Sequence, residues 1–179
     1  MNEFDFNKMV SQSRQVILGS SASSFEKYEN DGGLKEALIY MTIAAVLTGL
    51  LGLGGGLRGL ISNIITTLIG FLAFVYLVYF VGKQQGGTGT LDQVAYTFSL
   101  FWAPVSVLFA AITLVLLITI VGILFIPIVA ILALIANIYF AAIATKTSMN
   151  LEDQSKIWIT LIVASLGWMV VQAFVSKFL

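Results

Sequence analysis

The sequence predicts an all-α, polytopic membrane protein with five transmembrane helices and an amphipathic cytoplasmic N-terminal segment. Of its 179 residues, 59% are hydrophobic and 10% are charged, against about 45–50% and about 25% in a typical soluble domain. Five apolar stretches are also long enough to cross a hydrocarbon layer about 30 Å thick, which takes roughly 20 helical residues. We therefore divide the chain into an N-terminal segment, 1–33, and a transmembrane domain, 34–179.

The N-terminal segment is mostly polar and differs in kind from the rest of the chain. Four apolar side chains recur in it at helical spacing, namely Phe6, Met9, Val10 and Ile17. Such a stripe among polar residues predicts a short amphipathic helix that lies flat on the membrane and inserts these side chains into one leaflet. A partly disordered tail is the alternative for this segment.

The first two spans are expected near residues 34–53 and 57–81. Lys35 lies at the start of the first span and Lys83 follows the second, which places both charges at the polar ends of the helices. The run Gly52-Leu53-Gly54-Gly55-Gly56 separates the two spans. Several consecutive glycines interrupt a helix and predict a turn at this point.

The third apolar block, 91–120, is too long for one straight span and contains Pro104. Proline removes one helical hydrogen bond, so we expect a helix in two parts that is kinked at Pro104. An interfacial helix followed by a short span is the alternative. Thr90 and Gln93 have the spacing of a capping box, which predicts that this helix begins at Leu91.

The last two spans are expected near residues 123–145 and 157–178. Gly122 and Pro127 mark the short turn that leads into the fourth span, because proline is tolerated in the first turn of a helix. The third and fourth spans therefore form a tight helical hairpin.

The charges and the missing residue types exclude several classes of function. Lys plus Arg number 9 and Asp plus Glu number 9, so no basic field is present to attract nucleic acid. The chain has no cysteine and no histidine, which removes thiolate nucleophiles, imidazole bases and most metal sites. We expect no catalytic residues, no cofactor and no bound metal.

Uncharged polar residues inside the spans are the next candidates for a function. Asn63, Thr66 and Thr67 share one face of the second span, and Asn137 lies near the middle of the fourth. We expect these four side chains to form hydrogen bonds between helices. Alternatively, they would line the pore of a small channel or carrier for a neutral or hydrophobic solute.

Basic residues set the expected orientation. With the N-terminus inside, the inner segments hold seven Lys and Arg residues, and the outer segments hold only Arg58 and Lys177. This bias predicts a cytoplasmic N-terminus and a C-terminus outside. Lys83, Asp92 and Tyr96 then lie at the cytoplasmic surface, where we expect them to be available to a partner.

Several short stretches in their order along the chain resemble the Yip domain family, whose members interact with Ypt/Rab small GTPases. They are Phe25 in the N-terminal segment, Gly33-Leu34 with Ala37-Leu38 at the first span, Tyr96-Thr97-Phe98-Ser99-Leu100-Phe101-Trp102-Ala103-Pro104 in the third, and Ile138-Tyr139 in the fourth. The resemblance implies five spans, a cytoplasmic N-terminus, no enzymatic activity, and association with small GTPases and with other family members in vesicle traffic.

The sequence departs from the eukaryotic members of that family, because the segment before the first span lacks their Asp-Leu-x-Gly-Pro motif. We therefore expect a prokaryotic member in the cytoplasmic membrane. Its expected function is to organise membrane lipids or to recruit partners as a scaffold. The expected partners are lipids, further copies of the chain, other membrane proteins and, by family resemblance alone, a small GTPase.

Overall fold

The computed structural model describes residues 4–52, 56–119 and 122–178, and every regular element within these ranges is a helix. In chain order the elements are α1 (Phe6–Gly19), α2 (Ala22–Glu26), α3 (Leu34–Leu51), α4 (Gly56–Gln84), α5 (Leu91–Ile118), the 3₁₀ helix η1 (Gly122–Phe125), α6 (Ile126–Met149) and α7 (Gln154–Val175). Five of these segments, α3, α4, α5, η1 with α6, and α7, are long and apolar enough to cross a membrane. The predicted fold class is confirmed.

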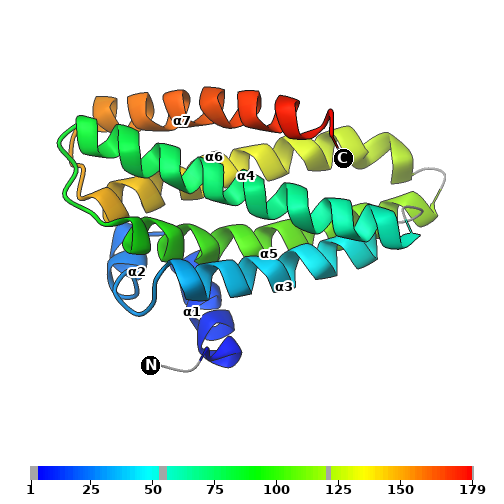
Figure 1. Cartoon of the computed structure of the whole chain (residues 1–179). Helices are drawn as coiled ribbons and strands as arrows, with labels where there is room; N and C mark the ends of the chain where they lie inside the picture. Colours follow the sequence, from blue (N-terminus) through cyan, green and yellow to red (C-terminus); the bar gives the residue numbers. More distant parts are fainter. Residues whose placement is uncertain (1–3, 53–55, 120–121, 179) are drawn as a thin grey trace.

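The spanning helices lie side by side and form the bundle in Figure 1. α5 packs mainly against α3 and α6, while α4 packs against α7 and α3. One end of the bundle holds α2, the start of α3 and the connections α4–α5 and α6–α7 (Figure 1). We call it the packed end, and we call the opposite end the open end.

α5 is one continuous helix from Leu91 to Ile118 with Pro104 inside it, so the proline does not divide it into two separate helices, and the kink at Pro104 stays a prediction. Ala103 and Val105 beside the proline are buried in the core, and packing against neighbouring helices lets a membrane helix tolerate a proline. Of the predicted glycine turn, residues 53–55 lie outside the described residues, as does residue 120 at the expected end of the third span.

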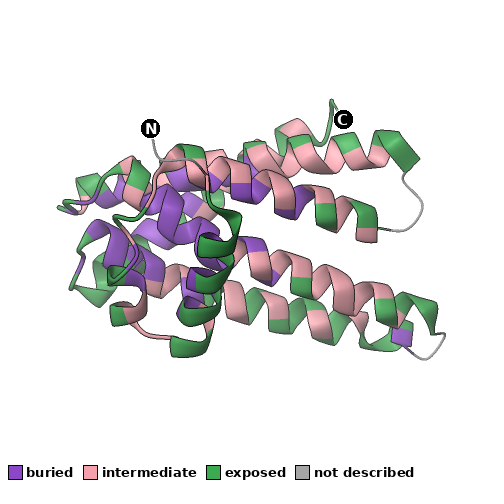
Figure 2. Ribbon diagram, turned by 90° about the horizontal axis from the view of Figure 1, so that it is seen from below, coloured by how far each residue is buried: buried purple, intermediate pink, exposed green. Residues whose placement is uncertain are grey.

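The hydrophobic core is concentrated toward the packed end of the bundle. The buried residues of α3 fall within 37–45, those of α4 within 70–82 and those of α5 within 94–105. Figure 2 shows this asymmetry as a purple region near one end of the molecule. Most large apolar side chains of the open end are exposed, which a lipid environment tolerates because its hydrocarbon is as apolar as they are.

α1 and α2 form a layer on the side of the bundle, which we call the N-terminal layer (residues 6–28). Figures 1 and 2 both show α1 running across the long axes of the spans, with α2 nearer the packed end. Asp5 caps α1 by accepting a hydrogen bond from the Lys8 amide. Ser20 then adopts a left-handed conformation with φ of 43°, which ends α1 and lets the chain turn into α2. α1 is therefore transverse to the spanning helices.

Candidate functional site

α1 is amphipathic, but the face it exposes differs in part from the expected one. Phe6 and Val10 are exposed and Ile17 is half-buried, whereas Met9 is only 2% exposed. Met9 shares the inner face of α1 with Gln12, Ser13 and Val16, because residues three, four and seven positions apart lie on one side of a helix. Met9 therefore packs in the protein core in this conformation and is not available for insertion into a bilayer.

Polar side chains fix the inner face of α1 to the bundle. The Tyr96 hydroxyl donates to Gln12 Oε1 at 2.6 Å, and Gln12 Nε2 donates to Asp31 Oδ2 at 2.5 Å. The Ser13 and Tyr40 hydroxyls are 3.1 Å apart and share a second hydrogen bond. These bonds join α1 to α5, to the α2–α3 connection and to α3, so the rotation of α1 about its own axis is determined.

The three residues expected to meet a partner are already engaged within the chain. Tyr96 is 1% exposed, so its assignment as a partner-binding residue is corrected: its hydroxyl holds α1. Asp92 remains exposed, and its Oδ1 accepts a hydrogen bond from the Leu34 amide at 2.8 Å. A carboxylate at this position caps α3 and complements the helix dipole. Lys83 is also exposed, and its Nζ donates to the Thr88 carbonyl at 3.0 Å.

The polar residues inside the spans bond mainly to helix backbone. Asn63 Nδ2 of α4 donates to the Ala45 carbonyl of α3 at 2.8 Å and to Thr48 Oγ1 at 3.1 Å. Asn137 Nδ2 donates to the Ala133 carbonyl of its own helix at 2.8 Å. Three clefts are described in this structure, and none is lined by Asn63, Thr66, Thr67 or Asn137. The contacts of Asn63 join α4 to α3, and the channel or carrier alternative stays a prediction.

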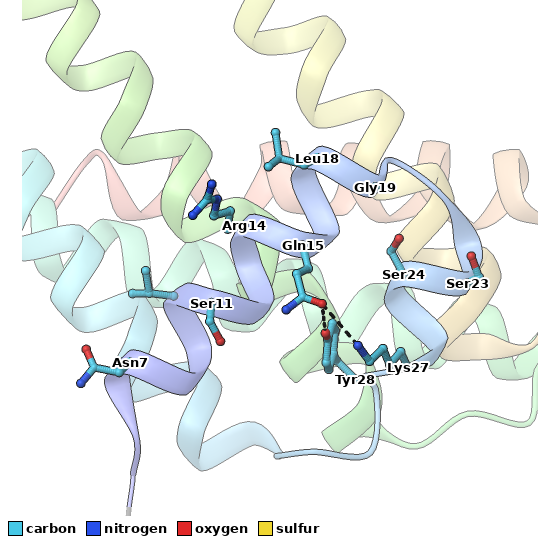
Figure 3. Close-up of a pocket in the computed structure, with 11 residues that line it drawn as sticks. Asn7, Ser11, Arg14, Gln15, Leu18, Gly19, Ser23, Ser24, Lys27 and Tyr28 are labelled. Carbon is cyan, nitrogen blue, oxygen red and sulfur yellow. Dashed lines mark hydrogen bonds between the residues drawn. The ribbon is translucent and has the colours of Figure 1, made fainter.

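The largest of these clefts opens between α1 and α2 and has a volume of about 870 Å³. Figure 3 shows Gln15 of α1 pointing across it to Lys27 and Tyr28 of the turn after α2, and Arg14 and Leu18 of α1 lie at its margin. Arg14 and Lys27 are the only charged residues in its lining. Sequence reasoning missed this site, because the cleft depends on how the turn at Ser20 places α2 beside α1.

Leu18 is the most exposed apolar residue of α1, at 73%. In Figure 3 Leu18 and Arg14 project from the edge of α1 that faces away from α2, which is the edge toward the open end. Val10, Arg14 and Leu18 are spaced by four residues and therefore follow one side of the helix. A helical wheel could have added Leu18 to the predicted membrane-inserting stripe.

The position of the N-terminal layer along the bundle is shown by its contact with α6. The Tyr139 hydroxyl donates to the Ser20 carbonyl at 2.9 Å. On the packed-end side of Tyr139, most of α6 is buried, including Ala144, Thr145 and 147–149. On the other side, most of its large apolar side chains, Ile138 and Ile135 among them, are exposed. The layer therefore lies at the boundary between the covered part of α6 and the part whose apolar side chains are exposed.

Acidic residues near the layer lie outside the cleft lining. Glu29 follows α2, and burial raises the pKa of its carboxyl, with a smaller contribution from the charge of Glu26. Within the part of the chain that the structure describes, no group of three or more His, Cys, Asp or Glu residues could hold a metal ion.

The family model of the Yip1 domain matches residues 16–174 of the chain. The chain belongs to the Yip1 domain family. No significant match is found among the curated proteins or among the solved structures. Yip1 proteins are associated with membrane traffic and are not known as enzymes, and the matched range covers the first four spans and all of the fifth except its last residue. The match begins at Val16, so it includes the end of α1, the turn at Ser20 and α2.

Proposed function

We propose that this Yip1-domain protein acts by association, as a scaffold that organises the surrounding bilayer or recruits partners, and that its N-terminal layer is the working surface. The observation that carries the proposal is the exposed edge of α1. Val10 and Leu18 flank Arg14 there, while the opposite face of α1 is anchored in the core. A rigidly held helix with such an edge is suited to insert into one leaflet, since its orientation is fixed before it meets lipid.

We also propose that the packed end faces the cytoplasm. Three of the nine basic residues, Lys8, Arg14 and Lys27, belong to the N-terminal layer. Lys35, Lys83, Lys146 and Lys156 lie on the end turns of the spans at the packed end. Arg58 and Lys177 lie toward the other end. Seven basic residues against two support a cytoplasmic packed end, and location in a prokaryotic cytoplasmic membrane stays a prediction from the sequence.

A partner would meet the packed end at side chains that are still exposed. Lys83 and Asp92 are both exposed at the ends of the connection between α4 and α5, and we propose this connection as the partner-binding surface. A small GTPase, another membrane protein or a second copy of the chain are the partners that the family suggests. Tyr96 is excluded from this surface by its burial.

The exposed edge of α1 can be tested with a double substitution, Val10→Ser with Leu18→Ser. Loss of both apolar side chains is expected to lower the fraction of liposomes that change shape when the purified protein is reconstituted, since insertion scales with buried apolar area. Electron microscopy of the liposomes measures this fraction. Residues 9, 12, 13 and 16 are unchanged, so the layer should stay docked on the bundle.

The matched control is Leu166→Ser with Val170→Ser. These residues are an exposed leucine and an exposed valine four positions apart on α7, so the control removes the same side chains from a lipid-facing span. It is expected to retain the deforming activity of the unmodified chain. Equal activity in both double variants would reject the N-terminal layer as the surface that shapes the bilayer.

A further inference from the structure

The exposed apolar surface of the bundle begins close to the packed end on α4 and α7. Phe80 is exposed and lies four residues before the end of α4, and the exposed Trp158 lies four residues after the start of α7. Four helical residues span about 6 Å. Ile159 and Ile162 continue this exposed apolar surface along α7.

On the side that carries the N-terminal layer, the exposed apolar surface begins farther from the packed end. Figure 1 shows the layer and α7 on opposite sides of the bundle. α6 packs against α2, and from Phe140 to Met149, all of which the structure describes, only Lys146 is exposed. Tyr139 is the next exposed side chain, ten residues or about 15 Å from the end of α6. In α3 the exposed large apolar side chains begin at Leu47, about 20 Å from the start of that helix.

The ends of α4, α6 and α7 lie at one level, so these distances can be compared. A Cβ atom added at Gly82 of α4 would lie 2.9 Å from Met149 Cε, and one added at Gly87 would lie 2.9 Å from the Met149 carbonyl oxygen. A Cβ atom added at Gly86 would lie 3.9 Å from Lys156 Nζ of α7. The exposed apolar surface therefore begins about 9 Å nearer the packed end on α4 and α7 than on α6.

The other edge of the α7 surface is displaced in the same direction. Gln172 Nε2 lies 3.5 Å from the Thr66 carbonyl oxygen, which places position 172 of α7 beside position 66 of α4. From this level α4 reaches ten residues farther toward the open end, to Gly56, whereas α7 ends at Val175 and is followed by the exposed Lys177. α7 thus stops about 10 Å short of the end of α4, as Figure 1 shows. A band displaced by a similar distance at both edges fits a bilayer of uniform thickness only if the bundle is inclined.

The length of the apolar surface on α4 also favours an inclined bundle. Its exposed large apolar side chains form one stripe that extends for about 35 Å, namely Leu57, Ile61, Ile65, Ile69, Tyr76 and Phe80. The hydrocarbon layer is about 30 Å thick. A helix whose apolar stretch is longer than this layer accommodates the difference by tilting.

We propose that the bundle is tilted from the bilayer normal, in the direction that lowers the packed end of α7 into the bilayer and lifts the N-terminal layer to the bilayer surface. An upright bundle meets a penalty at either level. An interface at the level of Trp158 would draw the exposed Lys27 and Lys146 into hydrocarbon, where charges are costly. An interface at the level of Tyr139 would expose Phe80 and Trp158 to water.

This tilt deepens the proposed function and rests on it, because the function places the N-terminal layer at the bilayer surface. The tilt is what allows the layer on one side and the apolar residues near the packed end of α7 on the other to meet the same surface. Its test measures the depth of single residues and not the shape of liposomes. Liposomes that keep their shape would therefore count against the proposed deformation of the bilayer and not against the tilt.

Spin labels on single cysteines in the full chain, reconstituted in phosphatidylcholine bilayers, test the tilt. Lys146→Cys on α6 and Ile159→Cys on α7 replace exposed residues near the packed end on the two sides. We expect the ratio of collisions with oxygen to collisions with a water-soluble nickel complex to be several-fold higher at position 159 than at position 146. Phe80→Cys is the control on α4 and should resemble position 159. Similar ratios at positions 146 and 159 would overturn the proposal.

A second pair of labels separates a tilted bundle from an upright one beside a locally thinner bilayer. Leu124→Cys in η1 and Phe178→Cys after α7 both replace exposed residues toward the open end. In a tilted bundle both labels lie near the same bilayer surface, so their collision ratios should be similar. An upright bundle would leave position 178 deeper in hydrocarbon, and a clearly higher ratio there than at position 124 would overturn the tilt.

Protection of position 159 from both reagents would also overturn the proposal, in favour of a second copy of the chain that covers α7. All five cysteines replace exposed side chains, and circular dichroism confirms that each variant keeps the helical content of the unmodified chain.

Discussion

Replacing Phe25 with alanine is expected to release the N-terminal layer from the bundle while the five spans stay folded. Phe25 is fully buried, and its ring meets the Phe101 ring of α5 edge-on, with the centroids 6.3 Å apart. Phe101 in turn stacks on Phe140 of α6 at 5.7 Å. Loss of a buried phenylalanine costs about 3–5 kcal/mol, and the other buried apolar side chains of the layer are Met9, Val16 and Tyr28.

Hydrogen exchange of residues 6–28 measures this release. Their amides should exchange much faster in Phe25→Ala, and those of α4 and α7 should exchange as before. Leu18→Ala is the control, because that leucine is 73% exposed and contributes little to docking. Unchanged protection of the layer in Phe25→Ala would show that Phe25 does not anchor it.

Replacing Gly89 with alanine is expected to destabilise the packed end strongly. A Cβ atom at this position would lie 1.6 Å from the Ser148 carbonyl oxygen and 2.7 Å from its carbonyl carbon, so backbone must move. The surrounding contacts resist that movement. The Thr88 amide donates to the Met149 carbonyl at 3.0 Å, and Asn150 Nδ2 donates to Thr88 Oγ1 at 3.0 Å. We expect a loss of at least about 3 kcal/mol, at the upper end of the range for overpacking.

Gly59→Ala is the matched control for this substitution, because a Cβ at Gly59 meets no atom within 4 Å. Gly59 lies inside α4, where alanine favours the helix by up to about 1 kcal/mol over glycine. Thermal unfolding in detergent should therefore show a much lower Tm for Gly89→Ala and an unchanged or slightly higher Tm for Gly59→Ala. Similar Tm values for the two variants would contradict the close approach of the α4–α5 connection to the end of α6.

The spans could be predicted because hydropathy and capping are local properties of the sequence. α5 begins at Leu91, and the capping box of Thr90 and Gln93 is present. The side chains that each span buries are harder to predict. In a bilayer both the lipid-facing and the protein-facing sides of a helix are apolar, so periodicity does not separate Ile135, which is exposed, from Phe140, which is buried.

The candidate site was predicted only in part, because it depends on contacts between residues that are far apart in the sequence. The sequence placed an amphipathic helix before the first span, and α1 is such a helix. Which of its apolar residues face protein depends on a hydrogen bond between Gln12 and Tyr96, which are 84 positions apart. In the arrangement that includes this bond, Met9 faces inward and Leu18 faces outward. The cleft also requires the left-handed turn at Ser20, and no local signal in the sequence specified how α2 would pack.

We propose that the N-terminal layer lies at the membrane interface with the Leu18 edge of α1 in lipid. The chain has no cysteine, so single cysteines can be introduced at Leu18 and, as a control, at Glu26, an exposed residue of α2 nearer the packed end. Spin labels on Leu18→Cys and Glu26→Cys in reconstituted bilayers report whether oxygen or a water-soluble nickel complex collides with each site. We expect the label at position 18 to meet oxygen preferentially and the label at position 26 to meet the nickel complex. A label at position 18 that meets the nickel complex as often as the label at position 26 would contradict the claim.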